Sequence, residues 1–588
     1  MSATNRRRGP GDVHAEAVLG IAVTVFVFGG LFTVWAAAAI GAEASGQPAP
    51  HGFAPIMCVR LAVGEYAWPG AAATVAVVLL IATYAAIAAL VIYKVRRRPD
   101  VEVDRAAPYL AQRKDLRNFS TQVVRERARR FGLPNEAAPG VYVGRSVPHG
   151  HDIWGSWEDM HVDIWGPRTG KTSTRAIPNI VAAPGACVVT SNKRDIVDAT
   201  RLSRERHGKV WVFDPQQQAN EPATWWWDPL GYVDGSIVRA VKMAGRFTSV
   251  VRPEHARADA YFEPAAEELV ANYLLAASVA GVPITEVYYW LTRPRDRTAM
   301  RILRRGGHDL SADAVEGVCS SPDRQRAGVF GTAQQMLSFL TAPSVTRWVT
   351  PGDGPVRPRF DVGEFIREGR DTLYLLSEET NKMAAPLVLA LTAALAEGAE
   401  NTATASPGGR LPTPMLFVLD EAANICPWKA LPDKYSHFGS RGIVMMTILQ
   451  SWAQGTAAWG EGGMAKLWGA ANIRVYGGGV FDMKFLSDLS KTSGVFEPET
   501  LATSRKSTQL IGGTVNRASR SEPVLDEHDL AAMPRGRMFV QISGAKPVLA
   551  RSVPWWEGPA AEEVRASLDR YEPSAAEIVP PTTVTATP

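Results

Sequence analysis

A strand–turn–helix signal around residues 160–177 constrains this chain more than any other stretch. Apolar residues alternate from Met160 to Ile164, which predicts a short strand, and the sequence WGPRTGKT then occupies residues 165–172. Successive backbone N–H groups of such a glycine-bearing turn, together with a helix N-terminus, form a cradle for a phosphate chain. We expect Lys171 to reach the β- and γ-phosphates and the Thr172 hydroxyl to bind Mg²⁺.

The turn departs from the common phosphate-loop spacing G-x-x-x-x-G-K-[ST]. Trp165 stands where the first glycine belongs, and Gly166 follows one residue late. The alternative interpretation is a Gly-Pro turn before a capped helix, with Lys171 in solvent. If the nucleotide interpretation holds, the residues that cradle the phosphates are Gly166, Pro167, Arg168, Thr169, Gly170, Lys171, Thr172 and Ser173.

Strands that alternate with helices predict an α/β fold around this turn. Runs typical of buried strands occupy residues 186–190, 209–213, 372–376, 415–419 and 442–449. This order favours a doubly wound parallel sheet, which binds ligands at the carboxyl ends of its strands. Residues 252–348 show apolar residues at helical spacing instead, so we expect an all-α insertion there.

Polar side chains follow two of these strands. Asp420 and Glu421 come directly after residues 415–419, and Gln450 follows residues 442–449. Asp420 is expected to hold the Mg²⁺ shell, Glu421 to orient the attacking water, and Gln450 to sense the γ-phosphate. The alternative for all three is ordinary solvent exposure at strand ends.

Composition sets the broad class of protein. The 588 residues suffice for about three or four domains. A formal net charge of +4 is too small to indicate a nucleic-acid partner. The four cysteines are far apart and include no C-x-x-C pair, which indicates neither a zinc site nor a disulfide framework.

Two long uncharged runs near the N-terminus predict a membrane anchor over residues 1–98. The runs at about 17–42 and 66–93 each exceed the ~20 residues that span a bilayer. Basic residues precede the first run and follow the second, which favours a multi-pass anchor in the cell membrane with the bulk of the chain cytoplasmic. A cleaved signal peptide is the alternative for the first run. Residues 99–153 are expected to be a connector whose basic helix either touches membrane lipid or is simply solvated.

Several motifs together resemble the type IV coupling proteins of conjugative DNA transfer, the TraG/TraD type. The resemblance covers roughly residues 140–557 and extends to the two-span anchor. The motifs that carry it are Gly166–Thr172, Asp228-Pro229-Leu230, Asp420-Glu421-Ala422, Ser440–Ile443, Ile448–Ser451, Glu522–Leu530 and Trp555-Trp556.

The resemblance implies a RecA-like P-loop domain over residues 154–251 and 349–557, interrupted by the all-α domain over 252–348. It implies a membrane-attached homohexamer that hydrolyses ATP with Mg²⁺. The implied cargo is single-stranded DNA with its relaxase, delivered to components of a type IV secretion channel. Such a channel would combine basic and aromatic side chains, and the candidates in this chain are Trp290, Arg293, Arg295 and Arg297.

Two positions depart from the family pattern. The phosphate turn is one residue shorter than usual, and Gly439 stands where the family often has an arginine. Arg441 is the available substitute for an arginine that stabilises transition-state charge across a subunit boundary; the alternative is a surface ion pair.

Two alternative functions remain. One is a membrane ATPase for protein export or double-stranded DNA translocation, and the other is a non-hydrolysing secretion scaffold. Residues 558–588 are expected to be a disordered tail.

Overall fold

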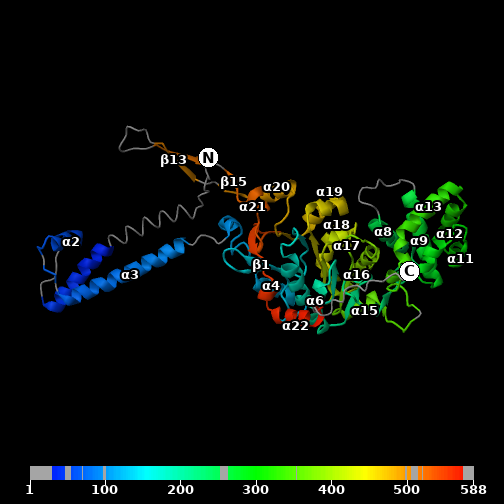
Figure 1. Ribbon diagram of the computed structural model, residues 1–588, viewed down its shortest axis with the longest axis horizontal. Coiled ribbons are helices and arrows are strands. Elements are labelled where there is room, and N and C mark those ends of the chain that lie inside the picture. Colours follow the sequence, from blue (N-terminus) through cyan, green and yellow to red (C-terminus); the bar gives the residue numbers. More distant parts are fainter. Residues whose placement is uncertain are drawn as a thin grey trace, which may run out of the picture. The chain divides into compact units, whose positions relative to one another are not determined.

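The computed structural model divides the chain into two compact units (Figure 1). The smaller contains residues 1–105 and 495–524, and the larger contains residues 106–494 and 525–588. The residues that the structure describes are 29–46, 54–65, 67–68, 70–96, 101–251, 262–352, 354–496, 499–504, 514–519 and 521–573.

The larger unit is organised around one mixed sheet. In its described residues the sheet has eleven strands in the order β2-β1-β17-β16-β11-β3-β10-β9-β4-β8-β5. The seven strands from β11 to β5 in this order pair with their neighbours in parallel. The remaining pairs, from β11 back to β2, are antiparallel. In sheet order the strands are β2 (Asp152–Gly155), β1 (Val141–Ser146), β17 (Val548–Arg551), β16 (Arg537–Ile542), β11 (Ile473–Tyr476), β3 (His161–Ile164), β10 (Ile443–Leu449), β9 (Met415–Leu419), β4 (Cys187–Ser191), β8 (Thr372–Leu376) and β5 (Val210–Phe213).

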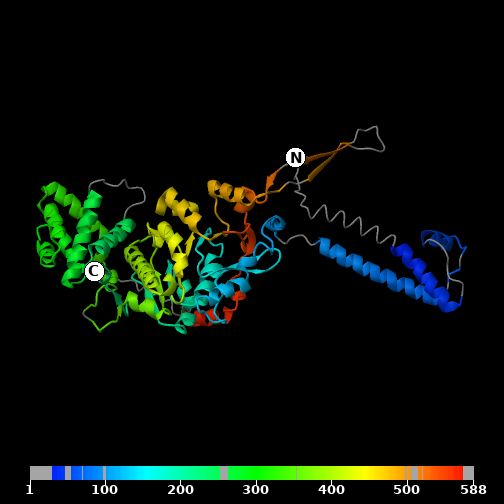
Figure 2. The same cartoon turned by 180° about the vertical axis from the view of Figure 1, so that it is seen from behind.

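The central strands are buried on both faces. Every residue of β3, β4, β8, β9 and β10 is buried. Continuous apolar runs of this kind fit a parallel sheet covered by helices on both sides, and Figure 2 shows helices flanking the strands. The helices are α5 (Ile177–Ala182), α6 (Asp195–Glu205), α16 (Ala385–Ala405), α18 (Leu431–Phe438) and α19 (Trp452–Ala470). The predicted parallel α/β sheet is therefore confirmed.

The strand order determines which side chains meet. Strand β10 lies between β3 and β9 and pairs in parallel with both. The turn after β3, Gln450 after β10 and Asp420 after β9 consequently emerge at one edge of the sheet, as expected for the carboxyl ends of parallel strands.

The insertion is helical throughout its described residues, but it begins earlier than predicted. Helix α8 was expected in the sheet domain; it packs on α9 of the insertion as well as on α16, and Phe247 of α8 lies 5.1 Å from Phe339 between ring centroids. Arg246 of α8 donates to Glu397 Oε1 of α16 at 2.6 Å, so α8 joins the insertion to the helices that cover the sheet. The helices are α7 (Pro229–Val233), α8 (Ile237–Val251), α9 (Phe262–Ala280), α10 (Thr285–Leu291), α11 (Thr298–Arg305), α12 (Asp309–Ser320), α13 (Asp323–Met336) and α14 (Pro343–Thr346).

Two further segments differ from the sequence-based boundaries. The range expected to be a connector supplies β1 and β2 of the main sheet. The range expected to be a disordered tail contains α22 (Ala561–Tyr571), which packs on α6. The Leu202 N–H donates to Ser567 Oγ at 3.1 Å, and Val564 is buried with Ile177 and Val181. A docked helix forms here because one face of α22 is apolar; residues 574–588 lie outside the described residues.

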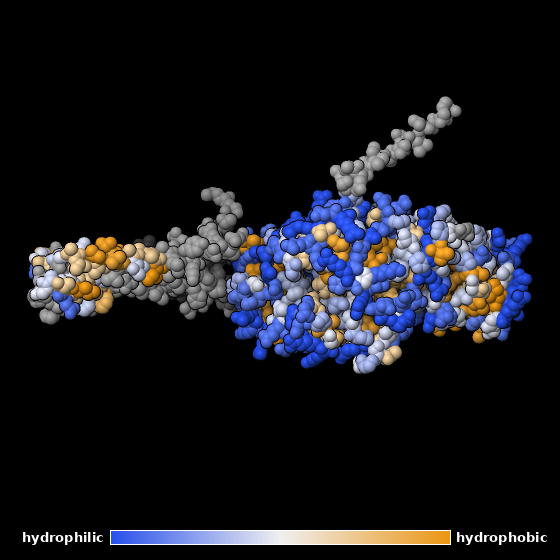
Figure 3. All heavy atoms as spheres, turned by 90° about the horizontal axis from the view of Figure 1, so that it is seen from below, coloured by the Kyte–Doolittle hydropathy of each residue, from blue (hydrophilic) through white to orange (hydrophobic). Residues whose placement is uncertain are grey.

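The smaller unit contains the N-terminal helices and a β-hairpin. A helix over residues 29–45 lies close to α3, since a Cβ at Gly41 would come within 2.5 Å of Ala73 Cβ. Apolar side chains of α3 reach the surface (orange at the left of Figure 3). Among the helices of the described residues none is long and apolar enough to cross a membrane, so the predicted transmembrane hairpin is not supported. The elements are α2 (Ala54–Ala62), α3 (Ala71–Arg96), β12 (Val495–Phe496), β13 (Glu499–Ser504), β14 (Thr514–Ser519) and β15 (Glu522–Pro523).

Truncation of the buried Val564 tests the docking of α22. We expect Val564→Ala to lower the free energy of unfolding by about 1–3 kcal/mol, because it leaves a cavity beside α5 and α6. Urea-induced unfolding measures this loss, with Arg565→Ala on the exposed face of α22 as the control. Equal stability of the two variants would show that α22 does not contribute to the fold.

Candidate functional site

The turn after β3 is anchored on both of its neighbouring strands. The Trp165 N–H donates to Leu449 O of β10 at 2.9 Å, and the Gly166 N–H donates to Gly478 O, after β11, at 2.9 Å. Gly170 has φ +99°, a conformation that strongly favours glycine. A π-helical turn, η3 (Thr172–Ala176), follows and leads into α5. The segment is thus the strand–turn–helix that the sequence predicted.

A second glycine loop explains why tryptophan occupies the first position of the turn. The Trp165 side chain is fully buried, and a Cβ at Gly477 would come within 2.0 Å of its ring. A Cβ at Gly166 would likewise lie 2.0 Å from Gly479 O. The backbone of residues 477–479 therefore packs directly on the turn, and only glycine fits at these positions. Sequence reasoning missed this loop, although three consecutive glycines were a signal.

Lys171 lies against the two predicted carboxylates. Its Nζ is 3.1 Å from Asp420 Oδ1 and also donates a hydrogen bond to Glu421 Oε1. Burial alone would lower the pKa of Lys171, but the two carboxylates raise it. Burial raises the pKa of Asp420 to about 6, against the opposing effect of the Lys171 charge. The structure thus brings these three residues together, and their assigned roles stay a prediction.

Glu421 is held in an unusual conformation beside Gln450. Its φ of +52° places a non-glycine residue in the left-handed region, a strain that clusters at functional sites. Gln450 Nε2 donates to Glu421 Oε2 at 2.8 Å, and the Gln450 N–H is itself bound by Gln454 Oε1 at 3.0 Å. The glutamate is thereby fixed at both oxygens, one by lysine and one by the amide.

Two oxygens beside Lys171 fit the predicted Mg²⁺ ligands. Asp420 Oδ1 is buried and, among the described residues, accepts no hydrogen bond of good geometry although Lys171 Nζ lies 3.1 Å away; the Thr172 hydroxyl directly follows Lys171 in the turn. Oxygen ligands of this kind are what Mg²⁺ prefers, with water and phosphate completing its shell. The described residues hold no cluster of three His, Cys, Asp or Glu side chains suited to another metal.

A buried ion pair lies directly beneath the turn. Arg175 Nε donates to Asp163 Oδ2 at 2.6 Å, and both side chains are completely buried. Arg175 also lies 3.3 Å from His161 Nδ1, and burial together with this guanidinium lowers the pKa of His161. The pair ties η3 to β3 and so positions the turn. Its sequence signal, an aspartate inside an apolar strand, was overlooked.

Arg441 lies at the opposite end of the sheet from Lys171 of its own chain. It precedes β10 and pairs with Glu400, whereas Gln450 follows β10. The seven residues of β10 span about 23 Å at ~3.3 Å per residue. Arg441 therefore cannot reach its own phosphate turn, and its role across a subunit boundary stays a prediction.

Trp290, the aromatic candidate for stacking with DNA bases, is buried. The Trp290 ring is 5% exposed and packs edge-on against Tyr273 at 5.8 Å. Tyr289 is 52% exposed, and the guanidinium of Arg293 lies 5.8 Å from its ring centroid. The prediction for Trp290 is wrong because helical packing turned its ring into the core, and Tyr289 is the exposed aromatic at this position.

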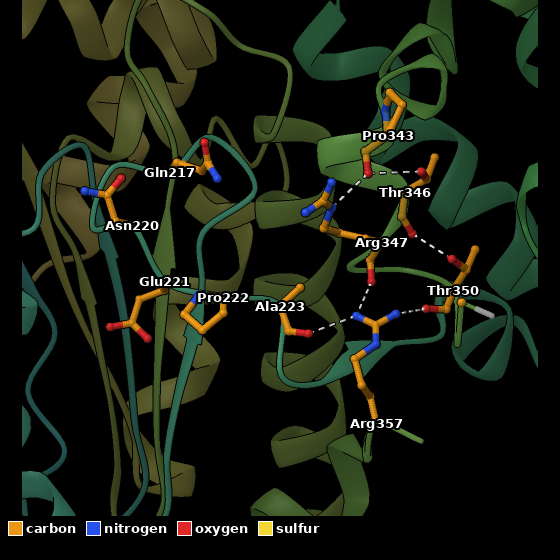
Figure 4. Close-up of a pocket in the computed structure, with 11 residues that line it drawn as sticks. Gln217, Asn220, Glu221, Pro222, Ala223, Pro343, Thr346, Arg347, Thr350 and Arg357 are labelled. Atoms are coloured by element: carbon orange, nitrogen blue, oxygen red, sulfur yellow. Dashed lines mark hydrogen bonds between the residues drawn. The ribbon is translucent and has the colours of Figure 1, made fainter. Parts of the chain in front are cut away.

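A shallow hollow of about 650 Å³ lies elsewhere, where the insertion joins the sheet domain (Figure 4). Arg357 donates there to Arg347 O at 2.7 Å, Thr350 O at 2.8 Å and Ala223 O at 3.1 Å. Burial and the nearby Arg347 lower the pKa of Arg357. Since the guanidinium is occupied by backbone carbonyls, this region is a structural clamp.

Comparison with known proteins places this site in context. Residues 414–535 match the family model described as the TraM recognition site of TraD and TraG. No curated protein sequence matches the chain. The unbound monoclinic form of the bacterial conjugative coupling protein TrwBdeltaN70 aligns with 74% of this chain and 91% of its own, at 15% identity and a TM-score of 0.51. Residues 414–535 thus carry a domain of the TraG/TraD coupling proteins, and the solved structure shows that the chain shares the fold of a conjugative coupling protein.

Two other solved structures are similar to this chain at lower TM-scores. The plasmid coupling protein TrwB in complex with ADP and Mg²⁺ covers 70% of this chain and 90% of its own, at 15% identity and a TM-score of 0.48. VirB4 of Thermoanaerobacter pseudethanolicus covers 74% and 100%, at 10% identity and a TM-score of 0.43. The family match over residues 414–535 includes Asp420, Glu421 and Gln450, while the phosphate turn lies outside it.

Substitution of the two carboxylates distinguishes their roles. We expect Glu421→Gln to leave ATP binding intact and to cut turnover by about 10²–10⁴-fold, the range for a lost general base. Asp420→Asn should weaken Mg²⁺-dependent binding as well as turnover, because it removes the carboxylate that is predicted to hold the metal. Nucleotide binding and hydrolysis assays measure both effects. Glu461→Gln, at a side chain that is 85% exposed, is the control; full activity of Glu421→Gln would exclude that residue as the base.

The buried His161 predicts acid sensitivity of the fold. Because its pKa is lowered in the folded state, the unfolded chain takes up a proton below pH ~6.5 that the folded chain excludes. The free energy of unfolding should therefore fall by up to about 1.4 kcal/mol per pH unit below that value. Chemical unfolding at several pH values should show a shallower decline for His161→Asn. The exposed His437→Asn is the control, and identical slopes for the two variants would contradict the prediction.

Proposed function

We propose that this chain is an ATPase that drives DNA into a conjugation channel. The observation that carries the proposal is the convergence of Lys171, Asp420, Glu421 and Gln450 at the carboxyl edge of the sheet, beside a glycine turn. A scaffold that does not hydrolyse nucleotide would have no use for a strained glutamate fixed by both a lysine and an amide. This argument favours turnover over the scaffold alternative.

The side chains of the site have separable tasks in hydrolysis. Backbone N–H groups of the turn hold the phosphate chain, and Lys171 exchanges its carboxylate partners for phosphate oxygens. Glu421, oriented by Gln450, accepts the proton of the attacking water. Asp420 and Thr172 would hold Mg²⁺, which neutralises phosphate charge when bound. Arg441 of a neighbouring subunit would add positive charge in the transition state of a homohexamer.

The cargo proposal rests on the family. The similar solved structures are described as conjugative or plasmid coupling proteins, and the matching family model is a TraM recognition site. We assign to this chain, by analogy, single-stranded DNA with its relaxase as cargo and type IV secretion components as partners. The helical insertion, which projects from the sheet domain with Tyr289 exposed, is the candidate surface for the cargo.

Attachment to the cell membrane is also part of the proposal. Its support is the pair of uncharged runs in the sequence and the apolar surface of the smaller unit. Val75, Val78, Leu79, Ile81 and Ile87 of α3 are all exposed. Side chains of this kind are stable at a lipid surface and costly in water. The larger unit would then lie in the cytoplasm.

An ATPase assay with different nucleic acids tests the function. We expect hydrolysis by the chain in detergent to be stimulated by single-stranded DNA more than by duplex, and to be lost in Lys171→Ala. If binding uses about three phosphate contacts, affinity for single strands should drop roughly 20-fold from about 50 to about 200 mM salt. Absence of hydrolysis under all conditions would favour the scaffold. Preference for duplex would favour a double-stranded DNA pump, and indifference to DNA would favour protein export.

A further inference from the structure

Arg535 lies at the phosphate turn, although it is far from the turn in sequence. It sits in the loop between α21 (Glu527–Ala531) and β16. Strand β16 is antiparallel to β11, and β11 is parallel to β3, so β16 begins at the edge where β3 ends. The residues just before β16 therefore reach the same edge of the sheet as the turn.

Contacts through the glycine loop hold this segment in place. A Cβ at Gly478 would lie 2.9 Å from Met533 O, which shows that the segment before β16 packs on residues 477–479. The same glycine loop packs on Gly166, as described above. A Cβ at Gly170 would have Arg535 Nε 3.9 Å away and Ser173 Oγ 3.7 Å away. The guanidinium is thus beside the glycine that precedes Lys171.

Arg535 also has no partner that would neutralise its charge. Its side chain is exposed, and within the described residues it forms no hydrogen bond, ion pair or ring contact. Lys171, in contrast, is already paired with Asp420 and Glu421. An unpaired guanidinium beside an anion cradle is suited to phosphate, which it binds through charge-assisted hydrogen bonds.

The strand order indicates which part of a phosphate chain Arg535 would meet. The spatial order of the strands in the sheet is β16-β11-β3-β10-β9. Asp420 and Glu421 therefore lie on the β9 side of the turn, and Arg535 lies on the β16 side. Under the proposed function, the terminal phosphate faces Glu421 and Gln450, where water attacks. The opposite side of the turn then serves the phosphates nearer the ribose.

We propose that Arg535 binds the inner phosphates of a nucleoside di- or triphosphate held by the turn. This assignment rests on the proposed nucleotide function and adds a residue from the C-terminal part of the sheet domain. It makes Arg535 a binding residue that serves ADP and ATP alike, since it contacts the phosphates that both share. Hydrolysis itself, which occurs at the terminal phosphate, does not require it.

Equilibrium binding of ADP and of a non-hydrolysable ATP analogue to the full chain tests the assignment. We expect Arg535→Ala to weaken both nucleotides by the same factor, roughly ten-fold, as for a lost hydrogen bond to a charged group. KM for ATP should rise while kcat changes little. Arg535→Lys should recover part of the affinity, because it keeps the charge but loses the forked geometry.

The controls separate this assignment from folding and from the proposed function. Lys546→Ala removes a cation at the other end of β16 and should leave nucleotide affinity unchanged. Arg535→Gln, which keeps most of the side-chain length, should repeat the loss if Arg535→Ala is poorly folded by thermal unfolding. Unchanged ADP affinity in a folded Arg535 variant, or weaker binding of the ATP analogue alone, would overturn the assignment while the proposed function stands. Failure of the unaltered chain to bind either nucleotide would overturn both.

Discussion

The contact of Lys171 with Asp420 and Glu421 joins two segments that are 250 residues apart in the sequence. Strand β10 lies between the two strands that carry these side chains and is parallel to both, so all three carboxyl ends lie at a common edge. Because these side chains are buried, loss of one partner would leave an unpaired charge that costs far more free energy than a charge at the surface. The edge is therefore complete only when the chain between these two segments, including the helical insertion, has folded.

The phosphate turn is supported from beneath by a buried ion pair, a feature that is uncommon in protein cores. Arg175 and Asp163 are removed from water entirely, and their pairing offsets only part of the desolvation cost. Glu421 adds backbone strain. A hydrophobic replacement of the ion pair could be at least as stable, but it would not hold η3 at a defined angle to β3. Precise placement of the turn is what these costly residues provide.

The sequence was a good guide wherever one segment contains its own signal. Alternating apolar residues indicated β3, apolar runs indicated β4, β8, β9 and β10, and the polar residues after these strands indicated Lys171, Asp420 and Gln450. The sequence was a poor guide wherever two distant segments decide together. Nothing in the sequence around Trp290 distinguishes a buried ring from an exposed one. The apolar face of α22 becomes evident only when the helix is seen packed on α6. The packing of residues 477–479 on Trp165 likewise depends on strand order, which no local pattern encodes.

The clamp at Arg357 has a consequence for how such a protein diversifies. One guanidinium holds the carbonyls of Ala223, before the insertion, and of Arg347 and Thr350, after it. The two ends of the helical domain therefore meet at a single point, and α8 adds a second attachment through its packing on α16. Helices that lie away from both attachments can then change in sequence or length, and with them the surface that they present, without displacing the edge that holds Lys171, Asp420 and Glu421.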